Sequence, residues 1–203
     1  MNKAACKVFI IDDDPSVRRS LSLLLRSGGY LVESFASAEE LLVIDEYTGE
    51  GCIILDIFMD GRSGLELQEE INRKFTCFPI IFISGRGDIP MSVQAMKKGA
   101  VNFLHKPVDD LDLIKAVEDA LFQSKEMCKE RQEETRIRTL LNSLTSREFQ
   151  IYRLLTTGLL NKQIAAELEI TEHTVKLHRG KITEKLGVKS VAELVKLAQK
   201  LKL

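Results

Sequence analysis

Lys7-Val8-Phe9-Ile10-Ile11-Asp12-Asp13-Asp14 is the stretch that decides the fold, because an almost wholly apolar run leads directly into three aspartates. A short apolar run of this kind is typical of a strand that is buried on both faces of a parallel sheet. Asp14 is followed by Pro15, and this pair is typical of the cap and first position of a helix. The stretch therefore predicts a strand, an acidic turn and a helix in succession.

The same succession recurs along the first 123 residues. The strand-like runs are residues 7–11, 31–35, 52–55, 79–83 and 101–104. Between them lie amphipathic segments, and the helix starts that we identify are Asp14, the capping box Ser37-Ala38-Glu39-Glu40, Asp88 and Asp109. Strands and helices that alternate five times predict an α/β fold, a doubly wound five-stranded parallel sheet.

The rest of the chain predicts helices alone. Residues 124–140 contain neither Gly nor Pro, and their Glu, Lys and Arg residues often stand three or four apart, which favours a solvated helix that continues the preceding one. Helix starts then follow at Thr145, Asn161, Thr171 and Ser190. Helices this short must pack together to be stable. We predict a first domain at 1–123, a helical linker at 124–140 and an all-α domain at 141–203.

Charge is divided unevenly along the chain. Residues 1–123 carry 13 Lys and Arg against 20 Asp and Glu, whereas residues 124–203 carry 16 against 10. An acidic part joined to a basic part suggests cation chemistry in one and a polyanionic partner for the other, although two differently charged soluble domains would give the same counts. No apolar run approaches the roughly 18 residues of a membrane span, and no signal-peptide core follows Met1. We expect a cytoplasmic protein without a membrane partner.

Cysteine usage excludes two further classes of site. The four cysteines are scattered, with no C-x-x-C pair and no paired histidines nearby. A disulfide framework or a zinc site is therefore not expected, and reduced thiols are the default.

Polar side chains stand at the ends of four predicted strands. They are Asp12 and Asp13, Asp56, Ser84 and Lys106. Open α/β sheets bind ligands at the carboxyl ends of their strands, so these groups should converge. Converged carboxylates repel one another and need a cation, and hard oxygen ligands suit Mg²⁺. Such a site could support attack of a carboxylate on phosphorus, with Lys106 and Ser84 binding phosphate oxygens. Aspartates at strand ends can also be simple turn formers and helix caps, which we expect for Asp14.

Residues 6–123 resemble the receiver domain of two-component response regulators. The resemblance rests on Ile10-Ile11-Asp12-Asp13-Asp14, Leu55-Asp56, Met59, Gly64, Ile83-Ser84-Gly85, Gly99-Ala100 and Lys106-Pro107. It implies a flavodoxin-like fold in which a sensor histidine kinase phosphorylates Asp56. It also implies that Asp12, Asp13, Asp56 and the backbone carbonyl of Phe58 bind Mg²⁺. Ser84 and Lys106 would hold the phosphate, Ser84 and Phe103 would form the switch, and the Lys106-Pro107 peptide would be cis.

Two positions depart from this family's pattern. Asp60 stands where proline is usual, and Phe58 stands where a polar residue or Met is more common. An added carboxylate at 60 could change the metal affinity of the site or hinder an anionic donor. An aromatic ring at 58 could shield the acyl phosphate from water. We therefore expect an altered lifetime of the phosphorylated state.

The last domain resembles the LuxR-type helix-turn-helix. The resemblance rests on Leu144-Thr145-Ser146-Arg147-Glu148, Gly158, Asn161-Lys162-Gln163-Ile164-Ala165, Leu168, Ile170, Thr174-Val175-Lys176-Leu177-His178, Ile182 and Lys185-Leu186-Gly187-Val188. It implies DNA binding by Asn161, Lys162, Thr171, Thr174, Lys176, Leu177, His178 and Lys181. His178 fits a phosphate contact and a helix-packing role equally well. Gly180 is unexpected inside a helix, where glycine costs about 1 kcal/mol relative to Ala, and it either permits close approach to DNA or is simply tolerated.

The two resemblances together imply a DNA-binding response regulator and not an enzyme. The order of domains resembles the subfamily that includes the nitrogen-fixation and styrene-catabolism regulators. Phosphorylation of Asp56 is expected to promote a homodimer through the fourth helix and last strand, which then binds paired operator sites to regulate transcription. RNA polymerase is a further candidate partner.

Two alternatives use the same residues. A Mg²⁺-dependent phosphatase or phosphotransferase would use Asp56 as nucleophile, but it needs an acidic residue two positions later, where Phe58 stands. A binding protein whose receiver has lost phosphorylation is disfavoured by the intact set of Asp12, Asp13, Asp56, Ser84 and Lys106.

Overall fold

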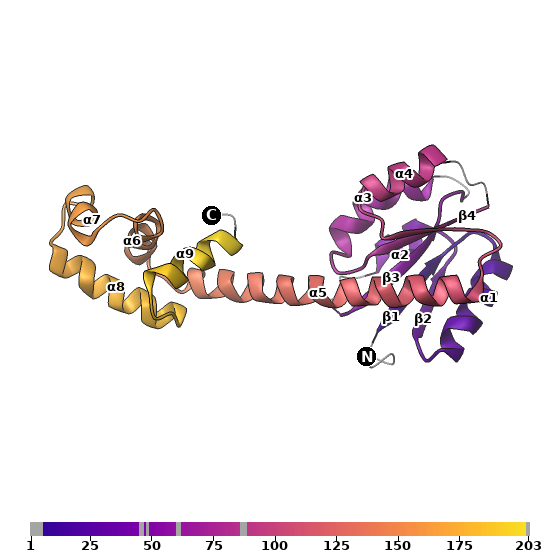
Figure 1. The fold of residues 1–203 in the computed structure, drawn as a ribbon, viewed down its shortest axis with the longest axis horizontal. Helices are drawn as coiled ribbons and strands as arrows, with labels where there is room; N and C mark the ends of the chain where they lie inside the picture. Colours follow the sequence, from indigo (N-terminus) through magenta and orange to yellow (C-terminus); the bar gives the residue numbers. More distant parts are fainter. Residues whose placement is uncertain (1–5, 45–46, 48, 60–61, 86–88, 202–203) are drawn as a thin grey trace. The chain divides into compact units, whose positions relative to one another are not determined.

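The computed structural model describes all residues except 1–5, 45–46, 48, 60–61, 86–88 and 202–203. The chain divides into two compact units, Met1–Lys129 and Glu130–Leu203 (Figure 1). The expectations for Asp60 and for a helix cap at Asp88 fall on residues outside the described part of the chain. Within that part, no helix is both long enough and apolar enough to cross a membrane.

The first unit is built on a five-stranded parallel sheet, as predicted. Its strands are β1 (Lys7–Ile11), β2 (Leu31–Phe35), β3 (Gly51–Asp56), β4 (Ile80–Ser84) and β5 (Asn102–His105). Their order across the sheet is β2-β1-β3-β4-β5, and each neighbouring pair is parallel. The chain order reverses between β1 and β3, so the carboxyl ends of these two central strands flank the topological switch point, where open α/β sheets bind ligands.

Helices cover both faces of this sheet. They are α1 (Pro15–Ser27), α2 (Ala38–Val43), α3 (Gly64–Lys74), α4 (Ile89–Lys97) and α5 (Asp110–Asn142). Successive strand residues point to opposite faces, so Phe9 and Ile53 pack in one apolar cluster with α2, α3 and α4, whereas Val8 and Ile54 pack in the other with α1 and α5. All four cysteines are buried, and the described residues include no disulfide.

In the first unit, the helix caps follow the sequence with two differences. Asp14 accepts a hydrogen bond from the backbone N–H of Ser16 and begins α1, as predicted. Ser37 caps α2, but Glu40 accepts from the N–H of Ala36 and not from that of the cap itself. The start of α3 was not identified from the sequence, although Ser63 forms a complete capping box with Glu66.

The second unit is all-helical. It contains the last turns of α5 together with α6 (Ser146–Thr156), α7 (Asn161–Glu167), α8 (Glu172–Leu186) and α9 (Val191–Lys200). Its core is formed by one side chain or more from each helix, among them Ile137, Ile151, Ile164, Ile182 and Leu194. Thr145 and Glu148 form the predicted capping box of α6. Gly187, at a φ of +65°, ends α8 in the left-handed conformation that favours glycine.

The segment expected to be a linker is part of one helix. α5 runs without interruption from Asp110 to Asn142, so residues 124–140 continue the preceding helix as predicted. Ser124 and Cys128 are buried in the first unit, whereas Ile137 is buried in the second. The side chains between them, at residues 129–136, are exposed or half-buried.

Candidate functional site

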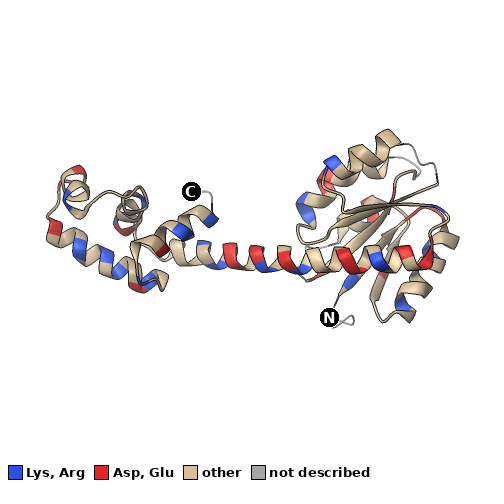
Figure 2. Ribbon diagram, in the orientation of Figure 1, with Lys and Arg blue, Asp and Glu red and all other residues tan. Residues whose placement is uncertain are grey.

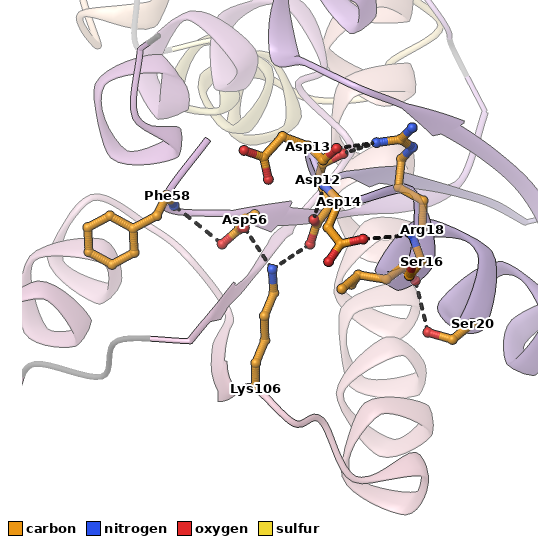
Figure 3. Close-up of polar contacts among 10 residues, drawn as sticks. Asp12, Asp13, Asp14, Ser16, Arg18, Ser20, Asp56, Phe58 and Lys106 are labelled. Atoms are coloured by element: carbon orange, nitrogen blue, oxygen red, sulfur yellow. Dashed lines mark hydrogen bonds and ion pairs between the residues drawn. The ribbon is translucent and has the colours of Figure 1, made fainter. Parts of the chain in front are cut away.

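Three aspartates meet at the carboxyl ends of β1 and β3 (Figure 3). Asp12 is completely buried, Asp56 is 3% exposed, and Asp13 is open to solvent. One carboxylate oxygen of each lies within 4.8 Å of those of the other two. The cause is the register of the sheet, which places Ile11 beside Leu55 and so brings the residues that follow each strand to the same edge.

Lys106 lies between two of these carboxylates. Its Nζ is 2.7 Å from Asp12 Oδ2 and 2.7 Å from Asp56 Oδ2. Burial opposes the charged form of Lys106, but hydrogen bonds to the two carboxylates outweigh it, so the pKa of the ammonium is raised. Burial also raises the pKa of the Asp56 carboxyl, and Lys106 opposes that shift. The Lys106-Pro107 peptide is cis, as predicted.

Ser84 and Phe103 stand on neighbouring strands beside this cluster. Ser84 ends β4 and is completely buried, and its carbonyl accepts a 2.8 Å hydrogen bond from the backbone N–H of Lys106. Phe103 is half-buried on β5, packs against the core, and contacts His105 edge-on at 5.3 Å between ring centroids. Phe103 pairs with Phe82, so it stands two register positions before Ser84.

The acidic turn is supported by Arg18, a contact that was not predicted from the sequence. Arg18 Nη1 donates to the backbone carbonyls of Asp12 at 2.6 Å and of Asp13 at 2.9 Å (Figure 3). The backbone N–H of Asp14 donates to Asp12 Oδ1 at 2.9 Å. The one available signal was a basic residue a single helical turn beyond Asp14. These contacts fix the turn that presents Asp12 and Asp13.

The donor set of this cluster fits a hard cation. Three carboxylates offer oxygen atoms close together, and such oxygens are the ligands that Mg²⁺ and similar ions prefer. The backbone N–H of Phe58 donates to Asp56 Oδ1 at 3.3 Å, which holds residue 58 next to this carboxylate. The acidic cluster could therefore bind a metal ion.

A second candidate surface lies on α7 and α8. Lys162, Thr171, Lys176, Leu177 and Lys181 are exposed, as a DNA-facing role requires. Asn161, Thr174 and His178 are half-buried. Thr171 caps α8 by accepting from the N–H of Thr174, which orients the start of this helix.

His178 and Arg179 refine the set expected from sequence. The Nδ1 atom of His178 is buried and has no hydrogen-bond partner among the described residues, so part of this ring packs into the domain. Arg179 donates from Nη1 to Asn161 Oδ1 at 3.4 Å and so links α8 to α7. This contact was not predicted from the sequence. The buried Nδ1 atom favours a packing role for that side of the His178 ring. A phosphate contact remains open to the other ring nitrogen.

Comparison with known proteins assigns both halves of the chain. The response regulator receiver domain model matches residues 8–118, and the model of bacterial regulatory proteins of the luxR family matches residues 142–198. The chain belongs to the response regulators. It is 42% identical over 194 residues to nodulation protein W of Bradyrhizobium diazoefficiens, covering 96% of this chain and 86% of the relative. It is 41% identical to the response regulator protein TodT of Pseudomonas putida, covering 100% and 89%.

Solved response regulators have the same fold. The structure of the response regulator StyR is 46% identical, covers 97% of this chain and 99% of its own, and superposes with a TM-score of 0.78. Full-length FixJ from B. japonicum is 35% identical, covers 97% of each chain, and has a TM-score of 0.55. The predicted family and fold class are confirmed.

This response regulator therefore joins a receiver to a DNA-binding domain and regulates transcription. The relatives TmoT and FixJ are named as a response regulator and a transcriptional regulatory protein and not as enzymes, which disfavours the phosphatase alternative. The two domains imply DNA and a sensor kinase as partners.

Proposed function

We propose that a histidine of a sensor histidine kinase passes a phosphoryl group to Asp56, and that this modification promotes dimerisation and sequence-specific DNA binding of this protein in the cytoplasm. One observation carries the proposal. The nearly buried carboxylate of Asp56 is bonded to Lys106 and lies beside Asp12 and Asp13. No other carboxylate of this cluster combines burial, a strand-end position at the centre of the sheet, and contact with the backbone of Phe58.

The transfer would use this chain's own residues. An oxygen of Asp56 attacks phosphorus, a P–O bond forms, the donor's P–N bond breaks, and its electron pair returns to the histidine nitrogen. Lys106 would bind one phosphoryl oxygen, because its ammonium already lies 2.7 Å from the acceptor carboxylate. The hydroxyl of Ser84 would donate to another. Both groups thus stabilise negative charge on the phosphoryl group.

Magnesium is the cation that we assign to the acidic cluster. Asp12, Asp13, Asp56 and the backbone carbonyl of Phe58 would hold it, since the carboxylate oxygens lie close enough together to share one ion. When bound, Mg²⁺ would neutralise the carboxylates and screen the charge of the incoming phosphoryl group.

Ser84 and Phe103 form the proposed switch. A phosphate on Asp56 favours the arrangement in which Ser84 moves toward it and Phe103 packs inward, and a switch needs two such arrangements that the phosphate distinguishes. The nearby helix α4 exposes Ile89 (80%), Val93 (44%) and Met96 (46%). Their spacing places them on one face of α4, and an apolar stripe of this kind supports the dimer interface expected on α4 and β5.

The proposed DNA interface uses the α7–α8 surface. α8 would enter the major groove with Thr174, Lys176, Leu177, His178 and Lys181, while Asn161, Lys162 and Thr171 would contact the backbone. Two such helices in a dimer would bind paired half-sites. RNA polymerase is the candidate partner once the protein is bound at a promoter.

The test compares the full chain with two variants, Asp56→Asn and the matched control Asp119→Asn, whose aspartate is exposed on α5. Each is incubated with acetyl phosphate and Mg²⁺, and its intact mass, oligomeric state and affinity for selected DNA duplexes are measured. We expect one stable phosphoryl group, dimerisation and tighter DNA binding in the wild type and in Asp119→Asn, and none of these in Asp56→Asn. An Asp56→Asn variant that responds like the wild type would overturn the assignment. Repeated turnover of acetyl phosphate without a persistent acyl phosphate would instead indicate an enzyme.

A further inference from the structure

Gly180 has no structural reason to be a glycine within the described part of this chain. It is the ninth of the 15 residues of α8, where glycine is the poorest helix former other than proline. Its backbone is not in the left-handed region, where Gly29, Gly99, Gly158 and Gly187 are found. Apart from its chain neighbours and the nearby backbone of α8 itself, a Cβ atom built at position 180 would meet nothing within 4 Å among the described residues. Alanine would therefore fit here and would favour the helix.

The surroundings of Gly180 locate it on the outer face of α8. Helical spacing places it on the same side as His173, Leu177 and Glu184, which are seven and three residues before it and four after it. The side chains that bury α8 in the domain core, Val175, Ile182 and Leu186, lie on the opposite side. Leu177, one turn before the glycine, is 56% exposed.

The charge around Gly180 indicates which kind of partner would bind this face of α8. Lys176, Arg179 and Lys181 stand next to the glycine, Arg179 with a hydrogen bond to Asn161, whereas the acidic residues of α8, Glu172 and Glu184, lie near its two ends (Figure 2). A basic surface centred on a helix complements the phosphates of duplex DNA, whose major groove is about 12 Å wide. An α-helix with its side chains is about 10–12 Å in diameter, so the fit is tight and a side chain on the leading face limits how deeply the helix can enter.

We propose that Gly180 sets the depth to which α8 enters the DNA major groove. The missing side chain lets the helix backbone approach the bases at this turn, so that Leu177 and the flanking lysines reach the base edges. This inference rests on the proposed DNA-binding function and adds a specificity-determining position to it. The requirement for glycine thus arises in the complex with DNA and not in the folding of the chain.

The proposal predicts opposite signs for two measurements on Gly180→Ala. Replacing glycine by alanine in a helix should raise the melting temperature of the second unit by about 4–8 °C. The added methyl should hold the helix away from the groove and weaken binding about tenfold, as the loss of one base contact would. Gly180→Leu, with a longer side chain, should weaken binding further. A glycine that is merely tolerated would show the gain in stability alone.

The experiment uses the full chain and a library of DNA duplexes with a randomised 20-base-pair core. Wild-type protein with acetyl phosphate and Mg²⁺ selects duplexes from this library, and their affinities for each variant are then measured by fluorescence anisotropy at one fixed salt concentration. The matched control is Thr135→Ala, which replaces an exposed residue of α5 by a better helix former away from α7 and α8. Thr135→Ala should bind the selected duplexes like the wild type.

Each outcome decides the inference. Weaker binding of Gly180→Ala, at equal or higher thermal stability, supports it. Equal affinity of Gly180→Ala and wild type for the selected duplexes overturns it and leaves the DNA-binding function intact. If the wild type enriches no duplex at all, the proposed function and this inference fall together.

Discussion

At the scale of single residues, Lys106 explains how three carboxylates can share one site. Its ammonium lies between Asp12 and Asp56, at 2.7 Å from an oxygen of each, and Asp12 is completely buried. Buried charges persist where they are paired and hydrogen-bonded. Arg18 adds two hydrogen bonds to the backbone of the acidic turn. Two basic side chains therefore stabilise the site. Lys106 pairs with the carboxylates, and Arg18 binds the backbone of the turn that presents them.

We expect Phe58 to lengthen the lifetime of the acyl phosphate on Asp56. The backbone N–H of Phe58 donates to Asp56, and the residue is 39% exposed, with its ring pointing away from the aspartates in Figure 3. We expect Phe58→Asn to shorten the lifetime of the acyl phosphate severalfold, because a polar side chain next to Asp56 would admit water, and about 1 kcal/mol in the barrier changes a rate about fivefold. The measurement is the decay of phosphorylated protein followed by intact mass. Equal decay rates in the two proteins would exclude shielding by the ring.

Glu148 makes the stability of the second unit depend on pH. Hydrogen bonds from Lys185 and from the backbone of Thr145 lower the pKa of this carboxyl to about 2, against an ordinary value of 4.5. A carboxyl with a lowered pKa stabilises the fold above its unfolded-state pKa and loses that effect as the pH falls toward the folded-state pKa. We expect the melting temperature to fall between about pH 4.5 and pH 2, and this part of the fall to be absent in Glu148→Gln. Identical pH profiles would contradict the role of this ion pair.

At the scale of elements, a buried hydroxyl bonds α5 to the amino ends of β3 and β4. Ser124, which is completely buried on α5, accepts from the N–H of Gly51 at 2.9 Å and donates to the carbonyl of Cys77 at 2.5 Å. These partners stand at the start of β3 and just before β4. Gly51 itself allows close packing, because a Cβ there would overlap Phe78 and the carbonyl of Lys7. The junction therefore holds α5 where it leaves the first unit.

Removal of this hydroxyl should loosen the junction. Ser124→Ala leaves a buried N–H and a buried carbonyl without their shared partner, which costs about 1–3 kcal/mol. We expect faster hydrogen exchange in peptides that contain the starts of β3 and β4, together with a lower melting temperature of the first unit. Ser20→Ala is the control, since Ser20 is exposed on α1. An unchanged exchange pattern in Ser124→Ala would show that the hydroxyl is dispensable.

Elements were predictable where the local pattern was strong. The first and last residues of β1 and β2 are the ones predicted from the sequence. The predicted ends of the other three strands each differ from the observed ends by one residue. The helix α3 was expected from the alternation of strands and helices, but its start, with the capping box of Ser63 and Glu66, was not identified from the sequence. In the second unit every helix start was found, since Thr or Ser with Glu three residues later marks two of the four.

At the scale of the whole molecule, the two units share one helix. α5 is continuous from Asp110 to Asn142, and its middle section is exposed or half-buried. Ion pairs at 2.6 Å between Lys129 and Glu126 and at 3.4 Å between Arg136 and Glu133 accompany this section. Such pairs support an exposed helix only modestly. We propose that this helix carries the effect of phosphorylation from the receiver to the DNA-binding domain.

Interruption of that helix should uncouple the two functions. Gln132 is exposed, and Gln132→Pro costs about 3 kcal/mol of helix stability. We expect both units to stay folded and Asp56 to accept phosphate, while phosphorylation no longer changes DNA affinity. Gln132→Ala serves as the control because it preserves the helix. A proline variant that keeps the full response to phosphorylation would show that the signal does not depend on continuity of α5.

The amino-acid sequence by itself determined the fold class, the two domains and the set of polar residues at the strand ends, because these follow from local periodicity, helix caps and strand order. Only the tertiary structure decided how those residues meet. Lys106 and Asp56 are 50 positions apart, and Gly51 and Ser124 are 73 apart, so neither bond has a local signal. The same holds for Gly180, whose empty surroundings became visible only once the fold showed which face of α8 is free. Local patterns specify elements, whereas contacts between distant residues depend on how the elements pack.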